Sequence, residues 1–191
     1  MRRPGGFILK IKTCKVCRAK FSTQRPLQSV CSPECSLTLV TLRRSKAERQ
    51  EALESKKVIR LKKEQLKTRA QWLRETQTVF NAYCRLRDKN EPCISCGRYH
   101  QGQYHAGHYR TVGSHPELRF NELNVHKQCS VCNNHKSGNI VEYRINLIKK
   151  IGVDNVEWLE GNHEPKKYSI NELKEIKSTY KLKLKELAKG Q

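Results

Sequence analysis

The apolar residues of this chain are spaced for helices over much of its length, and their density changes between segments. Residues 34–91 contain no glycine or proline, and the residues that dominate there (Arg, Lys, Glu, Gln, Ala and Leu) are good helix formers. The pattern predicts one or two long helices over about residues 37–86. Apolar residues form only a narrow stripe in residues 43–68 but are denser in residues 72–86. This predicts that the second stretch packs on the following domain.

Two further helices are predicted towards the carboxyl end. Apolar residues at helical spacing run from Ile140 to Ile151 and stop at Gly152, a residue type that commonly follows the last turn of a helix. Ser169 and Glu172 have the spacing of a capping box, which predicts the start of a last helix. We expect both helices to form core and scaffold, without a catalytic role.

The charge of the chain indicates a polyanionic partner. Its 191 residues include 39 Lys and Arg against 18 Asp and Glu, a formal net charge of +21, and nucleic acid is the usual partner of so positive a surface. Residues 1–92 hold 23 basic and 8 acidic residues, so the first half is the stronger electrostatic anchor. The helix predicted over residues 43–68 then has two interpretations. It is either a basic arm that lies along DNA phosphates or a solvated helix held by Glu–Lys pairs, and its excess of positive over negative residues favours the first.

Other classes of protein fit the composition less well. A ribosomal or histone-like protein would carry a similar charge, so charge alone does not tell what happens to the bound strand. A membrane is a weaker alternative, because the sequence has no run of about 18 apolar residues. Residues 1–6 do not lead into the apolar core of a signal peptide, so we expect action in the cytoplasm, where thiols stay reduced.

The cysteines predict two zinc sites. Eight of the nine fall into four closely spaced pairs, a clustering typical of zinc ligands and rare in disulfide frameworks. Cys93-x2-Cys96 and Cys129-x2-Cys132 together supply four sulfurs, so their zinc would be coordinatively closed and structural. The alternative to a zinc site is that these are free, buried cysteines. It is disfavoured, because two C-x2-C pairs rarely occur together in one sequence by chance. The ninth, Cys84, is expected to be a small apolar residue on a helix.

The first set of four cysteines lies near the amino terminus and predicts a second structural zinc. Its members are Cys14, Cys17, Cys31 and Cys35. Basic residues flank the set, Lys15 and Arg18 among them, which favours a DNA-binding finger. The alternative is a small ribbon that stabilises the fold or contacts protein.

Six of the seven histidines lie between residues 100 and 135, a density that indicates a functional centre. Phosphodiester hydrolysis needs a base that activates water and a metal that stabilises the leaving oxygen, and a neutral imidazole suits the first task. For His126 a site residue and a core residue are equally good interpretations. His100 and His115 are expected to be surface residues.

These motifs resemble those of the HNH, or His-Me finger, endonucleases, and more closely those of the NinG (Rap) recombination proteins of lambda-type phages. The shared pattern has two amino-terminal cysteine pairs, a basic helix, a GHY-type motif at residues 107–109, an LRF-x3-N-x-H-x-Q-C-x2-C-N run at 118–133, and SGN at 137–139. The resemblance covers essentially the whole chain. It implies a structure-selective endonuclease that acts on branched DNA, including Holliday junctions and D-loops, during phage homologous recombination.

The resemblance also assigns roles to single residues. It places the general base at His108, at the end of the first strand of a hairpin, and gives Asn124 the role of orienting that base. Many HNH enzymes have Asp or His where this chain has Gly107, and no aspartate occurs in residues 93–139, so the catalytic Mg²⁺ or Mn²⁺ is expected to rely on His, Asn and substrate phosphate. The candidate ligands of this metal are His105, Asn133 and His135. Phosphate contacts are expected from Arg110, Arg119 and Lys136, for each of which a solvated charge is the alternative.

Taken together, the fold class expected is a small zinc-stabilised α+β protein with three parts. Residues 1–40 would form a four-cysteine zinc ribbon, residues 41–78 a basic helical arm, and residues 79–191 a ββα-metal, HNH-like nuclease domain with carboxyl-terminal helices. The alternatives to a branched-DNA endonuclease are a non-catalytic zinc-ribbon DNA-binding protein and an HNH nuclease that cuts duplex DNA. Besides DNA, the expected partners are a second copy of the chain and phage recombination proteins, with no membrane.

Overall fold

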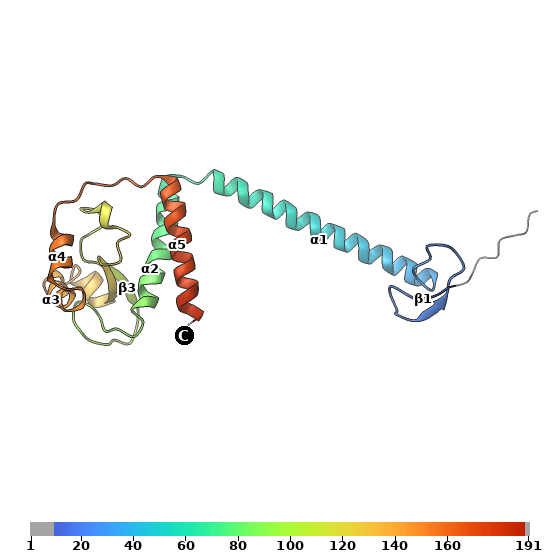
Figure 1. The fold of residues 1–191 in the computed structure, drawn as a ribbon, viewed down its shortest axis with the longest axis horizontal. Helices are drawn as coiled ribbons and strands as arrows, with labels where there is room; N and C mark the ends of the chain where they lie inside the picture. Colours follow the sequence, from blue (N-terminus) through green and yellow to red (C-terminus); the bar gives the residue numbers. More distant parts are fainter. Residues whose placement is uncertain (1–9, 190–191) are drawn as a thin grey trace, which may run out of the picture. The chain divides into compact units, whose positions relative to one another are not determined.

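The computed structural model describes residues 10–189; residues 1–9, on which the predictions of a zinc ribbon and of no signal peptide partly rest, and residues 190–191 lie outside the described part. The described chain is mixed α/β and mostly helical, with two short antiparallel hairpins (Figure 1). None of the described helices is long and apolar enough to span a membrane. The chain divides between Leu66 and Lys67 into two compact units, each with one cysteine cluster.

The first unit is a hairpin followed by one long helix. Strands β1 (Ile11–Thr13) and β2 (Lys20–Ser22) pair antiparallel. Helix α1 (Pro33–Gln65) begins four residues earlier than expected, because the Ser32 side chain caps it by accepting a hydrogen bond from the Cys35 amide and a proline occupies the first turn. Cys35 therefore lies in the first turn of α1, and the helix start belongs to the cysteine cluster.

Helix α1 is supported by local interactions alone within the described part of its unit. None of its 33 residues is buried, and an exposed ion pair between Arg44 and Glu48 (2.9 Å) is of the i,i+4 kind expected for a solvated helix. The apolar positions that form a narrow stripe in the sequence of this helix therefore stay exposed or half-buried among the described residues of the unit. At 1.5 Å per residue the helix is about 50 Å long.

The break between the two long helices comes from a capping box that sequence analysis missed. Thr68 accepts from the Gln71 amide, and the Gln71 side chain accepts from the Thr68 amide, so that helix α2 (Arg69–Arg87) starts anew after α1 ends. The boundaries expected after residues 40 and 78 both fall inside helices, and the structural division lies at this capping box instead.

The second unit is built on α2 and α5 (Ile170–Lys189), which lie side by side (Figure 1). The predicted capping box is confirmed, since Ser169 and Glu172 exchange backbone-to-side-chain hydrogen bonds of 2.8 and 3.2 Å. The thick apolar stretch of α2 packs here, with Phe80 fully buried, and Cys84 is buried in the same cluster as expected. Burial raises the pKa of the Cys84 thiol to about 12, so this cysteine stays protonated and unreactive.

A hairpin and two short helices complete the second unit. Strands β3 (Tyr104–His108) and β4 (Val125–Cys129) pair antiparallel, and the loop between them carries the 3₁₀ turn η1 (Pro116–Leu118). A π-helical turn, η2 (Val131–His135), follows β4. Helix α3 (Ile140–Ile151) ends at Gly152 as predicted, whereas α4 (Val153–Glu160) was not predicted. Tyr143 and Leu147 of α3 are fully buried against the loop and α4, so these helices are scaffold.

A buried ionic cluster joins α2 to β4. Asp88, 3% exposed, receives two hydrogen bonds of 2.8 Å from Arg87 and one of 3.0 Å from the Lys127 amide. The Nδ1 atom of His126 lies 3.5 Å from the Asp88 carboxylate, and its Nε2 lies 3.1 Å from the Leu123 carbonyl. His126 is therefore a core residue, which was one of the two interpretations of the sequence beside a site residue. Burial lowers its pKa.

We expect Asp88→Asn to lower the free energy of unfolding by about 3–5 kcal/mol at pH 7, because it takes the nearest carboxylate from the partly buried Arg87 and Lys150. The other carboxylates that they reach, Glu122 and Glu91, lie 3.9 Å away. Burial opposes ionisation of Asp88, but its contacts with His126 and Arg87 outweigh burial and hold the pKa below its usual range. This stabilisation is present above the unfolded pKa of about 4 and is lost as pH falls further.

Urea unfolding followed by tryptophan fluorescence measures this effect, since both tryptophans of the chain lie in the second unit. Asp154→Asn, an exposed change of the same kind on α4, is the matched control. Equal unfolding midpoints for the two variants at pH 7 would contradict the prediction.

Candidate metal and catalytic sites

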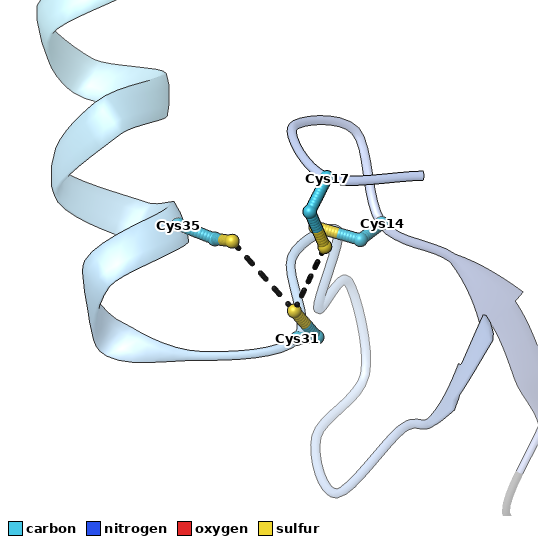
Figure 2. A group of neighbouring side chains, drawn as sticks. All are labelled: Cys14, Cys17, Cys31 and Cys35. Atoms are coloured by element: carbon cyan, nitrogen blue, oxygen red, sulfur yellow. Dashed lines mark hydrogen bonds between the residues drawn. The ribbon is translucent and has the colours of Figure 1, made fainter. Parts of the chain in front are cut away.

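The four amino-terminal cysteines converge as the zinc prediction requires. Their Sγ atoms all lie within 4.8 Å of one another, with 3.4 Å between Cys17 and Cys31 and 3.7 Å between Cys31 and Cys35. Figure 2 shows two of the side chains reaching from the turn after β1, one from the segment before α1 and one from the helix start. Tetrahedral zinc with bonds of about 2.3 Å separates its sulfurs by about 3.8 Å, so the cluster has the dimensions of a zinc site.

The acidity of these thiols also suits metal binding. Burial raises the pKa of Cys14, but amide groups of Val16, Cys17 and Cys31 outweigh burial and bring this pKa to about 6. Hydrogen bonds with the side chains of Cys17 and Cys14 raise the pKa of the Cys31 thiol to about 12. The Cys14 thiolate therefore forms easily, and its negative charge opposes ionisation of Cys31. A divalent cation bound by both sulfurs would remove this repulsion between the two negative charges.

The second cluster, Cys93, Cys96, Cys129 and Cys132, has the same dimensions and is more deeply buried. All four Sγ atoms lie within 4.8 Å of one another. Backbone amides point at the sulfurs, from Cys129 to Cys93 (3.3 Å) and from Cys132 to Cys129 (3.4 Å). The four residues come from the segment before β3, the end of β4 and η2, so a zinc here would fix the open end of the hairpin, where β3 starts and β4 ends. His100 is exposed as expected, and its Nε2 lies 3.1 Å from the Cys96 sulfur.

His108 lies at the end of β3, where it is held by a backbone group. Its Nε2 is 3.1 Å from the carbonyl oxygen of Arg119, and because a carbonyl can only accept, Nε2 carries the proton and Nδ1 carries the free lone pair. Burial lowers the pKa of His108, and the charge of Arg119 acts in the same direction. Hydrogen bonds to the backbone of Arg119 and of Ala106 act in the opposite direction but do not outweigh burial. The imidazole is therefore neutral near pH 7, as a general base must be.

Asn124 holds the backbone around His108 and makes no hydrogen bond with the imidazole among the described contacts. It is fully buried; its Oδ1 accepts from the Arg110 amide (2.7 Å), and its Nδ2 donates to the carbonyls of Arg110 (3.0 Å) and Leu118 (3.1 Å). These bonds join the segment after His108 to the residue before Arg119. Asn124 therefore orients the histidine indirectly, through the loop that supplies the Arg119 carbonyl.

A hollow of about 300 Å³ opens beside His108 and is called the His108 hollow. Its lining residues are Ala106, His108, Thr111, Val112, Asn133, Ser137, Gly138 and Ile140. The structure thus brings together His108 and Asn133, one of the three candidate metal ligands. The Nδ2 of Asn133 donates to Asn134 (2.7 Å), which leaves the Oδ1 of Asn133 free to bind a cation. Neither His105 nor His135 lines this hollow.

The two remaining candidate ligands lie elsewhere on the same elements. His105 is on β3 opposite Gln128, and its Nε2 is buried without a hydrogen-bond partner in the described structure. His135, the last residue of η2, is exposed. Gly107 between the two strand histidines is required by packing, because a Cβ atom there would overlap the Gln128 side chain. This contact explains why Asp or His cannot stand at position 107 here.

The Ser137-Gly138-Asn139 segment is part of the site, although only its place in the family pattern indicated a role. All three residues have positive φ angles (47°, 89° and 46°), a strained run that neighbouring contacts must hold in place. The Gly138 amide donates to the Cys132 carbonyl (2.9 Å), and the Gly138 carbonyl accepts from Gln128 (2.5 Å). The segment therefore connects the second cysteine cluster to the wall of the His108 hollow.

The expected phosphate-binding residues are distributed over both units. Lys15 and Arg18 are exposed beside the first cysteine cluster, and Lys136 is exposed directly after η2. Arg110 is half-buried, with its Nη2 2.7 Å from His115 and its Nε buried without a partner in the described structure. His115 is half-buried as well, 3.1 Å from Glu117, and is not the free surface residue expected.

Comparisons with known proteins place these features in a family. The family described as "Bacteriophage Lambda NinG protein" matches residues 8–190. "Protein ninG" of Escherichia phage lambda is 44% identical over 183 residues, which cover 90% of this chain and 89% of the relative. The proteins of the same name from Escherichia phage 933W and Salmonella phage P22 are each 42% identical, over 92% and 90% of this chain and 93% and 90% of the relatives. No solved structure matches.

Proposed function

This chain belongs to the NinG family of lambda-like phages, and we propose that it is a metal-dependent endonuclease. Its substrates would be branched DNA, such as Holliday junctions and D-loops, in phage recombination. Its histidine site supports this activity. The observation that carries the proposal is the state of His108. It is neutral, its ring is held by the Arg119 carbonyl, and it lines a hollow together with Asn133. A simple DNA-binding module has no need of such a histidine.

In the proposed reaction the residues of the His108 hollow divide two tasks. His108 accepts the proton of an attacking water at Nδ1, while the Arg119 carbonyl and the Asn124 bonds keep the ring in place. Asn133, with the hydroxyl groups of Thr111 and Ser137, offers oxygen donors to Mg²⁺ or Mn²⁺. These are neutral oxygens, which suits a hard cation that keeps several waters and takes substrate phosphate oxygens. When bound, the cation supplies stabilisation of the leaving oxygen.

The arrangement of elements supports an HNH-like domain. A hairpin with the histidine at the end of its first strand is followed by a helical turn that carries Asn133, and a four-sulfur cluster joins the two. We propose that this zinc-framed hairpin and turn form the ββα-metal core, that two such chains act together on a junction because two symmetric nicks need two sites, and that they act in the host cytoplasm alongside phage recombination proteins.

One observation favours the non-catalytic alternative, a zinc-ribbon protein that binds DNA without cutting it. No carboxylate is among the residues that line the His108 hollow, whereas cation sites usually include one. A nuclease that cuts ordinary duplex DNA is the other alternative. Incubation of the chain with a four-way junction and with a duplex of the same sequence, with and without Mg²⁺, separates the three. The proposal predicts metal-dependent cleavage of the junction in preference to the duplex.

We expect Asn133→Ala to lower junction cleavage at least about tenfold at fixed Mg²⁺, with recovery as the Mg²⁺ concentration is raised, because the variant loses one metal-binding oxygen. Asn155→Ala, an asparagine on α4 outside the hollow, is the control and is expected to cut like the wild type. An Asn133→Ala variant with the wild-type Mg²⁺ dependence would remove this residue from the proposed metal site.

A further inference from the structure

The second unit contains another hollow of about 300 Å³, here called the cationic hollow, which no step of the proposed chemistry uses. Three segments supply its positive side chains: the first residue of α2, the residue after η1, and the connection between α4 and α5. These side chains are Arg69, Arg119, Lys166 and Lys167. No carboxylate is among the residues that line it.

The two arginines of the cationic hollow are held in place by neutral groups. Arg69 donates to the Tyr168 carbonyl (3.2 Å), and Arg119 donates to the Gln77 side chain (3.3 Å), so each guanidinium is fixed while its charge remains. Lys166 forms an ion pair with Glu172 (3.0 Å), but Arg69, Arg119 and Lys167 form none among the described residues. Burial lowers the pKa of Arg119, and the nearby charge of Arg69 acts in the same direction.

Such a cluster of positive charge is unfavourable until an anion binds. Like charges repel, and water screens the charge of the half-buried Arg119 less fully than the charges of the exposed Arg69, Lys166 and Lys167. Guanidinium groups held in fixed orientations bind phosphate oxygens through paired hydrogen bonds. The hollow therefore has the charge and the donors of a phosphate site.

Arg119 also connects the cationic hollow with His108. Its side chain lines the cationic hollow, while its carbonyl accepts the hydrogen bond that orients the imidazole. An anion bound by the guanidinium therefore restrains the same residue whose backbone positions the base.

We propose that the cationic hollow binds a backbone phosphate of the DNA away from the bond that is cut, and that this interaction holds both the DNA and the Arg119 loop during cleavage. The inference deepens the proposed function and rests on it. The ligand is a phosphodiester of the nucleic acid backbone; a free phosphate ion carries the same chemistry, and calorimetry separates the two.

The test compares two double variants of the full-length chain that lose the same charge. Arg69→Gln with Arg119→Gln removes both arginines of the hollow, and Arg74→Gln with Arg85→Gln removes two exposed arginines of α2. Binding to a four-way junction is measured without Mg²⁺ by fluorescence anisotropy over a range of salt concentrations. Zinc content and thermal melting are measured on both variants to establish that they fold.

The hollow variant is expected to bind at least about tenfold more weakly than the exposed variant at physiological salt. Its plot of log affinity against log salt should be less steep by about 0.9 for each phosphate that the protein no longer neutralises. Arg69→Lys with Arg119→Lys, which keeps the charge, is expected to recover most of the binding. Equal affinity of the hollow and exposed variants, or no recovery by lysine in a folded protein, would overturn the inference.

Calorimetry with inorganic phosphate settles the nature of the ligand. Weak or absent binding of free phosphate agrees with a site for backbone phosphates, whereas submillimolar binding that vanishes in the hollow variant would identify a free-anion site and overturn the proposal. The proposed nuclease function is judged separately. If the wild type cuts the junction and the hollow variant matches the exposed variant in binding, only the inference fails; if the wild type never cuts but the binding difference holds, only the nuclease function fails.

Discussion

Replacement of His108 by alanine is expected to slow four-way-junction cleavage by about 10²- to 10⁴-fold, while zinc content and junction affinity stay at the wild-type level. The imidazole is the only described group of the His108 hollow that is neutral near pH 7 and able to take a proton. Alanine removes that group without removing a zinc ligand or one of the arginines that line the cationic hollow. Single-turnover cleavage in Mg²⁺ measures the effect.

The pH dependence gives a second readout of the same residue. A base works in its deprotonated form, and burial lowers the pKa of His108 below the ordinary histidine value of about 6.5. Cleavage by the wild type should therefore rise with pH below about 6.5 and be level by neutral pH, and the residual activity of His108→Ala should lack that rise.

His163→Ala is the matched control, because this histidine lies after α4, outside the histidine-rich segment, and contacts only the Trp158 carbonyl and ring among the described interactions. It is expected to cut like the wild type. If the two alanine variants cut at equal rates, the catalytic assignment of His108 is wrong and the non-catalytic DNA-binding alternative gains support.

Cys129→Ser is expected to release the zinc of the second cluster and to unfold the unit that begins at Lys67. Binding of a structural zinc contributes about 10–16 kcal/mol, as much as the whole free energy of unfolding of a typical domain, about 5–15 kcal/mol. Cys129 ends β4 and is 2% exposed, so a serine there leaves the cluster's other three sulfurs without a fourth. Metal analysis should give two zinc ions per wild-type chain and one per variant.

Cys17→Ser provides the comparison, since it should also leave one zinc but spare the second unit. Tryptophan fluorescence and thermal melting should show the second unit folded in Cys17→Ser and unfolded in Cys129→Ser, because Trp72 and Trp158 both belong to that unit. A Cys129→Ser chain that keeps two zinc ions and a cooperative melting transition would refute the structural role assigned to the cluster.

Features whose causes are local could be predicted from the sequence. The cysteine pairs, the capping box at Ser169 and the end of α3 at Gly152 each depend on residues a few positions apart, and the structure confirms all three. Helix α4 was missed because it follows α3 directly, with Gly152 as both the end of one helix and the start of the next. The capping box at Thr68 was missed because it lies inside a long run of good helix formers.

Features that depend on distant partners could not be predicted in the same way. Asn124, His126 and Gln128 alternate along the chain at β4, and all three are buried polar residues. The role of each follows from its partners. Asn124 binds the loop after His108, and His126 lies beside Asp88. Gln128 donates to Ser95 and to the Gly138 carbonyl. A motif read along the chain indicates that these residues matter, but only the contacts tell positioning from chemistry.

The adjacency of Cys132 and Asn133 in η2 makes the proposed nuclease sensitive to oxidation. A zinc held by four sulfurs cannot activate water. Of its four thiolates, Cys96 is the half-buried one that an oxidant can reach, and its oxidation would release the metal. Loss of that zinc would displace Asn133 through the peptide bond that joins it to Cys132. Hydrolysis would then stop although neither His108 nor Asn133 had been modified, and reducing conditions with zinc would restore it.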